Sequence, residues 1–235
     1  YADNFNCALP ILQRHGLHAT FVVATGFLDG GRMWNDTLIE SVRLTDCEAI
    51  DLKDLGIGLL KTKTVEDKRE ALARLIPAVK HLEPAARNEA VTALPALART
   101  DDLPDDLMMT SDNLRTLRAA GMGVGAHTVN HPILARCDYA TARHEIEEGR
   151  SNLQDLLGEP INLFAYPNGK LGADYTPEHV SMVRELGFDA AVSTNPGASM
   201  HGNDLHQLSR FTPWDRDAWR FGLRLAQNMR KRPVA

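Results

Sequence analysis

Short apolar segments alternate regularly with helical segments from residue 111 to the end of the chain. The pattern predicts helices at 111–120, 139–157, 177–186 and 215–230, and strands at 122–126, 161–165, 188–193 and 205–211. A further apolar run at 19–24 follows a helical segment at 4–14 and is typical of a strand buried on both faces. Such alternation favours a parallel sheet with helices outside it and right-handed crossovers, which is an α/β fold.

The region between the first predicted strand and residue 110 has a different pattern. Helical periodicity continues through most of it and is clearest at 66–81 and 84–98, and an acidic, proline-containing connector follows at 101–106. We expect one domain over residues 1–235, with a helical insertion at 36–109 that serves as a lid or an interface.

Charge and composition exclude several classes of protein. A net charge of −5 argues against sequence-independent binding of nucleic acid, which needs a basic face. No apolar run approaches the roughly 20 residues of a membrane-spanning helix. The cysteines, Cys7, Cys47 and Cys137, are too few and too widely spaced for a disulfide framework or a thiolate zinc site. The chain opens on Tyr1 without an initiator methionine, so we expect residues upstream of it.

Polar loops follow the predicted strands. In folds of this kind, active and binding sites lie in the loops at the carboxyl ends of the strands. His127 and His131 stand in such a loop, directly after the strand at 122–126. Neutral imidazole is a good ligand for zinc, cobalt or nickel. The alternative to a metal site is that the two are ordinary loop histidines without a shared role. Because a catalytic zinc uses three protein ligands, a carboxylate is still needed, and Asp3 is the nearest candidate.

Further candidate residues lie in the other loops. Tyr166 and Pro167 follow a strand, and such a turn can direct a backbone N–H at a developing oxyanion. His206 is a candidate general acid or base. Trp34 and Asn168 are candidates for contacts with a substrate, although tryptophans more often pack in cores.

Five segments together carry a family resemblance: Tyr1-Ala2-Asp3-Asn4, Leu9-Pro10-Ile11-Leu12, His18-Ala19-Thr20-Phe21-Val22-Val23, 125–132 (GAHTVNHP) and 164–169 (FAYPNG). In order and spacing they resemble the polysaccharide deacetylases, carbohydrate esterase family 4, with the NodB-homology domain. The resemblance implies a distorted or incomplete (β/α) barrel and a divalent-metal hydrolase that removes N- or O-acetyl groups from a polysaccharide or oligosaccharide.

The resemblance also assigns roles within the site. It makes His127 and His131 ligands of a divalent metal such as zinc, with cobalt or nickel as alternatives, and it makes Thr128 the brace of their loop. Tyr166 would offer its backbone N–H to the oxyanion, with Pro167 shaping the turn, and the metal would polarise the acetyl carbonyl and activate a water.

The chain departs from the family pattern at three points. The Thr-Phe-Asp-Asp-Gly motif, which holds the base and the third ligand, would stand before Tyr1, and the arginine of the third motif is not evident at 161–163. The late histidine that acts as general acid has only His206 as a substitute. We therefore expect a truncated deacetylase that binds metal weakly and has little activity.

Two other functions remain open, namely a non-catalytic glycan-binding relative of the family and a different metal-barrel enzyme such as a sugar isomerase. The second would need several carboxylates at strand ends. A missing first strand would also leave the strand at 19–24 with an exposed parallel edge, through which the chain could form oligomers.

Overall fold

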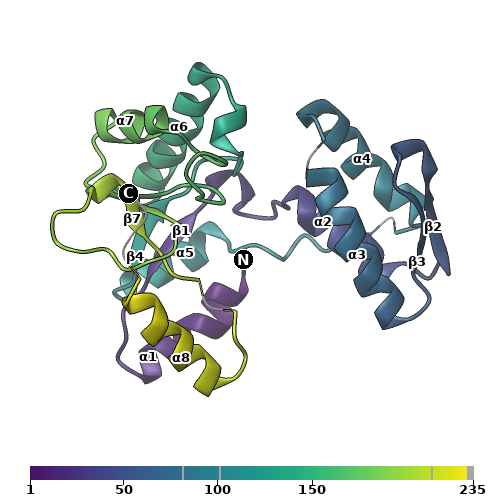
Figure 1. Ribbon diagram of the computed structural model, residues 1–235, viewed down its shortest axis with the longest axis horizontal. Coiled ribbons are helices and arrows are strands. Elements are labelled where there is room, and N and C mark those ends of the chain that lie inside the picture. Colours follow the sequence, from purple (N-terminus) through teal and green to yellow (C-terminus); the bar gives the residue numbers. More distant parts are fainter. Residues whose placement is uncertain (81, 101, 213, 232–235) are drawn as a thin grey trace. The chain divides into compact units, whose positions relative to one another are not determined.

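The computed structural model describes residues 1–80, 82–100, 102–212 and 214–231. His81 and Asp101, which end or begin two of the expected segments, lie outside the described residues. The chain divides into two compact units (Figure 1). The first comprises Asp3–Leu28 and Met109–Ala235 together with Tyr1, and the second comprises Asp29–Met108 together with Ala2.

The first unit is built on a five-stranded parallel sheet, with strand order β1-β4-β5-β6-β7. The strands are β1 (Thr20–Val23), β4 (Gly123–Ala126), β5 (Leu163–Ala165), β6 (Ala190–Ser193) and β7 (Leu208–Ser209). They fall within the five segments where the sequence predicts strands. Among the described residues β1 and β7 are edge strands, so the sheet is open and does not close into a barrel.

Helices and apolar side chains surround this sheet. The helices are α1 (Leu9–Arg14), α5 (Ser111–Ala119), α6 (Tyr139–Leu157), α7 (Pro177–Glu185) and α8 (Ala218–Met229). In Figure 1, α6 and α7 lie side by side. The core packs helix residues such as Leu114 and Ile146, both fully buried, against Phe164 of the sheet. The parallel α/β architecture is therefore confirmed.

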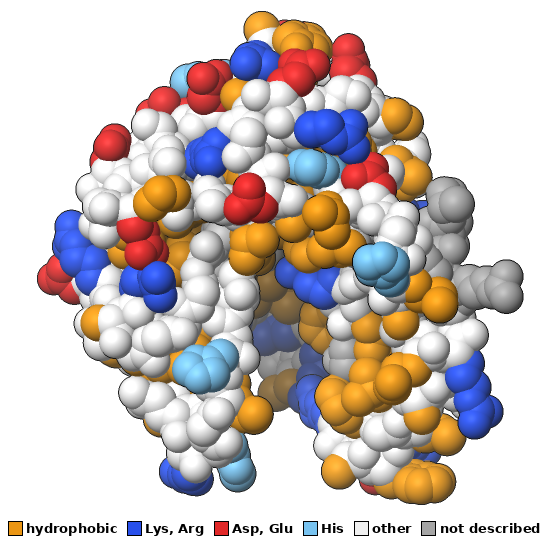
Figure 2. Space-filling view, turned by 90° about the vertical axis from the view of Figure 1, so that its left-hand side faces the viewer, with side chains coloured by type: hydrophobic (Ala, Val, Ile, Leu, Met, Phe, Trp, Pro, Cys, Tyr) orange, Lys and Arg blue, Asp and Glu red, His pale blue; other side chains and the backbone are white. Residues whose placement is uncertain are grey.

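The last helix is amphipathic, and most of it is exposed. Asn228, on its polar side, is buried and exchanges two hydrogen bonds of 3.0 Å with the backbone of Gly197. Its large apolar side chains reach solvent, and Figure 2 shows hydrophobic side chains gathered on this part of the unit. No helix in the described residues combines the length and the apolar character needed to cross a bilayer.

The second unit has its own core and is not purely helical. It contains α2 (Trp34–Leu44), β2 (Ala49–Leu52), β3 (Gly58–Lys61), α3 (Val65–Lys80) and α4 (Pro84–Leu97). The strands form an antiparallel hairpin, so the expectation of a purely helical insertion is wrong. Each strand contributes only one or two buried side chains, and such short strands give no clear alternation in the sequence. Leu38, Ile50, Leu60, Leu75 and Leu94 are among the residues that form its core.

Candidate active site

The carboxyl ends of the parallel strands bring polar loops to one edge of the first unit. His127 follows β4, Tyr166 follows β5 and Arg210 follows β7. Hydrogen bonds tie neighbouring loops together: the His127 N–H donates to the Val23 carbonyl at 3.0 Å, and the Gly26 N–H donates to the Val129 carbonyl at 3.0 Å. The structure thus gathers the loops that the sequence places at strand ends.

The two histidines of the predicted metal motif lie against each other at this edge. Their ring centroids are 4.7 Å apart and the planes meet at 74°. His127 Nδ1 lies 2.7 Å from the Ala165 carbonyl oxygen, so Nδ1 carries the proton and Nε2 keeps its lone pair for a ligand. Burial, and then the neighbouring His131, lower the pKa of His127 to about 3. The ring is therefore neutral over the physiological pH range, as a metal ligand must be.

The turn that carries the histidines is held in an unusual backbone conformation. Thr128 and His131 both have positive φ, 66° and 55°, a region that a β-branched residue such as Thr128 rarely adopts. The Thr128 hydroxyl accepts the His131 N–H at 3.0 Å and donates to the His127 carbonyl. A strained backbone conformation persists only where the surrounding structure fixes it, and such conformations are frequent at functional sites.

Helix α6 supplies those surroundings. The buried Glu145 carboxylate accepts the N–H groups of Val129 and Asn130 at 2.9 and 2.8 Å and the Asn130 side-chain amide at 2.7 Å. Gly149, one turn further along, has no side chain, and a Cβ there would meet the Thr128 carbonyl carbon at 2.7 Å. Together Glu145 and Gly149 let α6 lie directly against the turn and fix its backbone.

The residues present fit a divalent metal only in part. Two imidazoles in contact fit the ligand preference of zinc. Within the described residues, however, no group of three His, Cys, Asp or Glu side chains is close enough to hold a metal, so Asp3 does not complete the set. Glu145 contacts the same loop, but its two oxygens are engaged by three N–H donors.

The backbone N–H of Tyr166, which we expect to face an oxyanion, is part of the sheet in this structure. It donates to the Val192 carbonyl at 3.1 Å. The ring is buried and stacks on Tyr175 at a centroid distance of 3.9 Å, and the hydroxyl donates to the His206 carbonyl.

Pro167 and Asn168 form the turn after Tyr166. Asn168 has positive φ, 57°, and its carbonyl accepts the Thr194 hydroxyl at 2.6 Å. The Gly169 carbonyl accepts the Thr194 N–H at 2.8 Å, so the loop after β6 braces this turn. Because Ala165, which contacts His127, comes just before Tyr166, the turn lies at the same edge as the histidine pair.

His206 lies away from the histidine pair, and Trp34 belongs to the other compact unit. His206 precedes β7, and its Nε2 lies 2.8 Å from the Phe188 carbonyl, which precedes β6. It therefore sits at the amino end of the strands, opposite the histidine pair, and the structure does not bring it to the site. Trp34 belongs to the second unit, where it packs against that unit's core and lies 5.8 Å from the Arg87 guanidinium.

Sequence reasoning missed two residues at this edge, Glu145 and Arg210. Glu145 resembled the many solvated charges of a long amphipathic helix. Arg210 directly follows a strand of only two residues, and its position after a strand end was the one signal that could have indicated it.

The fold and the histidine pair define an α/β protein with a candidate metal-binding edge. A family model of polysaccharide deacetylases matches residues 80–191, which include both histidines and Tyr166. A Bacillus subtilis (strain 168) protein named as a polysaccharide deacetylase, YxkH, is 20% identical over 102 residues, which are 43% of this chain and 35% of that protein. These matches confirm the resemblance to the polysaccharide deacetylase family.

Solved structures agree with this assignment of the fold. The Streptococcus pyogenes deacetylase PplD, solved in complex with acetate, has a TM-score of 0.58 at 18% identity over 98% of this chain and 66% of its own. IcaB from Ammonifex degensii has a TM-score of 0.56 at 16% identity, over 95% of this chain and 68% of its own. The chain thus spans about two thirds of these proteins and shares the deacetylase-type fold, which confirms the predicted architecture.

Proposed function

We propose that this chain is a metal-dependent deacetylase that hydrolyses N- or O-acetyl groups on a polysaccharide or oligosaccharide. The observation that carries the proposal is the histidine pair, two imidazole rings in contact at the carboxyl edge of a parallel sheet, of which His127 is neutral. The family match to polysaccharide deacetylases supports the class of reaction.

In this proposal His127 and His131 hold the metal, zinc in the first instance and cobalt or nickel as alternatives. A bound divalent ion supplies polarisation of the acetyl carbonyl and activation of a water. The protein's own contribution is positional: Ala165 fixes the tautomer of His127, Thr128 joins the two ends of the turn, and Glu145 holds its backbone. Asn168 stands on the adjoining turn and is the proposed contact with the glycan.

A second function deserves a test, because one observation favours it. A catalytic zinc requires three protein ligands. In the described part of the chain no third ligand joins the histidine pair. A glycan-binding relative without catalysis would tolerate that arrangement. On either function we expect zinc to bind weakly to the chain.

The test combines metal binding with acetate release. Zinc, cobalt and nickel are titrated calorimetrically into the chain and into His127→Ala and His131→Ala, with His144→Ala, an exposed histidine of α6, as the matched control. We expect weak zinc binding that both site variants abolish and the control preserves. Zinc binding that is unchanged in His127→Ala would refute the assignment of the ligands.

Acetate release from an N-acetylated and an O-acetylated oligosaccharide is then measured with each metal. We expect slow release that requires metal and is lost in His127→Ala. Glycan binding without release would support the non-catalytic function instead, and the absence of both release and binding would overturn both functions.

A further inference from the structure

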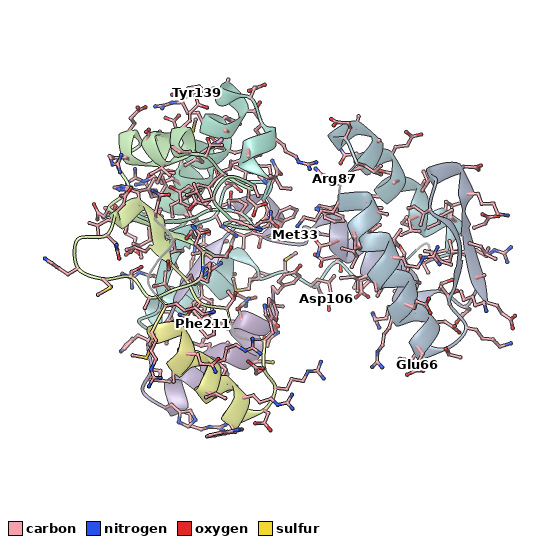
Figure 3. The ribbon with its side chains drawn as sticks, in the orientation of Figure 1. Met33, Glu66, Arg87, Asp106, Tyr139 and Phe211 are labelled. Atoms are coloured by element: carbon pink, nitrogen blue, oxygen red, sulfur yellow. The ribbon has the colours of Figure 1, made fainter. Side chains whose placement is uncertain are left out.

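Arg210 brings a positive charge to the same edge as the histidine pair. It is the first residue after β7, and its backbone N–H donates to the carbonyl of Ser193, the last residue of β6, at 3.0 Å. Arg210 therefore stands at the carboxyl ends of two adjacent parallel strands. Figure 3 labels Phe211, the next residue, on the segment that leads from β7 toward α8.

The guanidinium of Arg210 is partly buried, and its Nε finds no hydrogen-bond partner among the residues that the structure describes. Its Nε has no exposed surface and no hydrogen-bond acceptor, and no carboxylate within the described ranges forms an ion pair with it. Burial, with no acid to oppose it, lowers the pKa of Arg210. The positive charge is close enough to His127 to contribute to the low pKa of that ring.

The other partly buried arginines of this unit are satisfied. Arg150 donates to the Ile161 carbonyl at 2.7 Å and also to the carbonyls of Leu186 and Gly187. Arg143 lies 3.6 Å from the Glu185 carboxylate and 3.9 Å from that of Glu147. Buried charges in proteins are normally paired, so an unpaired guanidinium beside a candidate active site indicates a place for an anionic ligand.

We infer that Arg210 is the anion-binding residue of this edge and that it takes a carboxylate. The planar guanidinium offers Nε–H and Nη–H as two parallel donors, which match the two oxygens of a carboxylate. The identity of the carboxylate rests on the proposed function, because deacetylation releases acetate at this edge. Acetate bound here would neutralise the charge that Arg210 presents to His127.

The experiment measures acetate binding by the metal-free chain, so that it needs neither metal nor turnover. Sodium acetate is titrated while the arginine Nε–H signals are followed by NMR, with sodium chloride at equal ionic strength as the reference. The variants are Arg210→Gln and Arg210→Lys, and Arg216→Gln, an exposed arginine on the following segment, is the matched control. Melting temperatures confirm that each variant is folded.

We expect a saturable shift of one Nε–H signal with acetate and not with chloride. Arg210→Gln should weaken acetate binding by about tenfold or more, Arg210→Lys should retain part of the affinity, and Arg216→Gln should match the wild type. Equal shifts with chloride, or unchanged acetate affinity in Arg210→Gln, would overturn the inference.

The outcome is separable from that of the proposed function. Acetate binding through Arg210 without any acetate release would leave the carboxylate site standing and reject the deacetylase. Acetate release from glycans together with Arg210-independent acetate binding would reject the carboxylate site alone.

Discussion

At the scale of single residues, the site depends on groups that never touch a substrate. Thr128 and His131 adopt backbone conformations that cost energy, and the hydrogen bonds of Glu145 hold them. The HxxxH spacing made the two histidines predictable from sequence. Glu145 was not predictable, because its burial and its three donors arise only when α6 packs on the turn.

Glu145→Ala should therefore damage both stability and metal binding. Three buried donors would lose their acceptor, at a cost of about 3 kcal/mol in the free energy of unfolding. Zinc affinity should fall roughly 10- to 100-fold, as is usual when support of a ligand loop is removed. Urea unfolding and zinc calorimetry measure the two effects. Glu148→Ala, an exposed glutamate of the same helix, is the control, and equal behaviour of the two variants would show that Glu145 has no special role.

At the scale of elements, strand position was predictable to within a few residues, whereas the direction of a side chain at a strand end was not. Residues 205–207 form a short 3-10 turn before β7, and this places His206 at the amino end rather than at the site. The prediction that extended the strand over 205–211 could not separate these two positions. A two-residue strand depends on pairing with β6, which no local pattern reveals.

Helix α7 begins with a histidine in its capping box. The Thr176 N–H donates to His179 Nδ1 at 3.1 Å, and burial lowers the pKa of His179 below its usual value. The folded state therefore favours the neutral ring, and the unfolded chain binds the proton more readily. Stability from this cap is complete above about pH 6.5, the ordinary pKa of histidine, and is lost as the pH falls below it.

His179→Gln tests this pH dependence, because glutamine can accept the same N–H without titrating near neutral pH. We expect the variant to lose less stability than the wild type between pH 7 and pH 5 in urea titrations, with stabilities within about 1 kcal/mol at pH 8. His144→Gln, an exposed histidine, should keep the wild-type slope. A wild-type slope in His179→Gln would contradict the proposed cause.

At the scale of the whole molecule, the two units are built from separate apolar cores. Their boundary was partly visible in the sequence, since the alternation of strands and helices is interrupted between the first strand and residue 109. The hairpin of β2 and β3 was not visible, because four-residue strands with so few buried side chains give no clear period. The core of the second unit includes Leu75 and Leu94, and that of the first includes Leu114 and Phe164.

Because each unit has its own core, we expect each unit to unfold locally without the other. Leu75→Ala and Leu114→Ala each remove a fully buried side chain and should cost about 2–5 kcal/mol where they act. Because residues 29–108 form an insertion, their unfolding leaves a closed loop in the first unit, and the entropic cost of such a loop grows only with the logarithm of its length. Hydrogen exchange followed by mass spectrometry should therefore show faster exchange in Leu75→Ala within residues 29–108, with protection of β4 and β5 retained. Leu114→Ala should expose the sheet strands first. Loss of protection throughout the chain in both variants would mean that the two cores unfold as one.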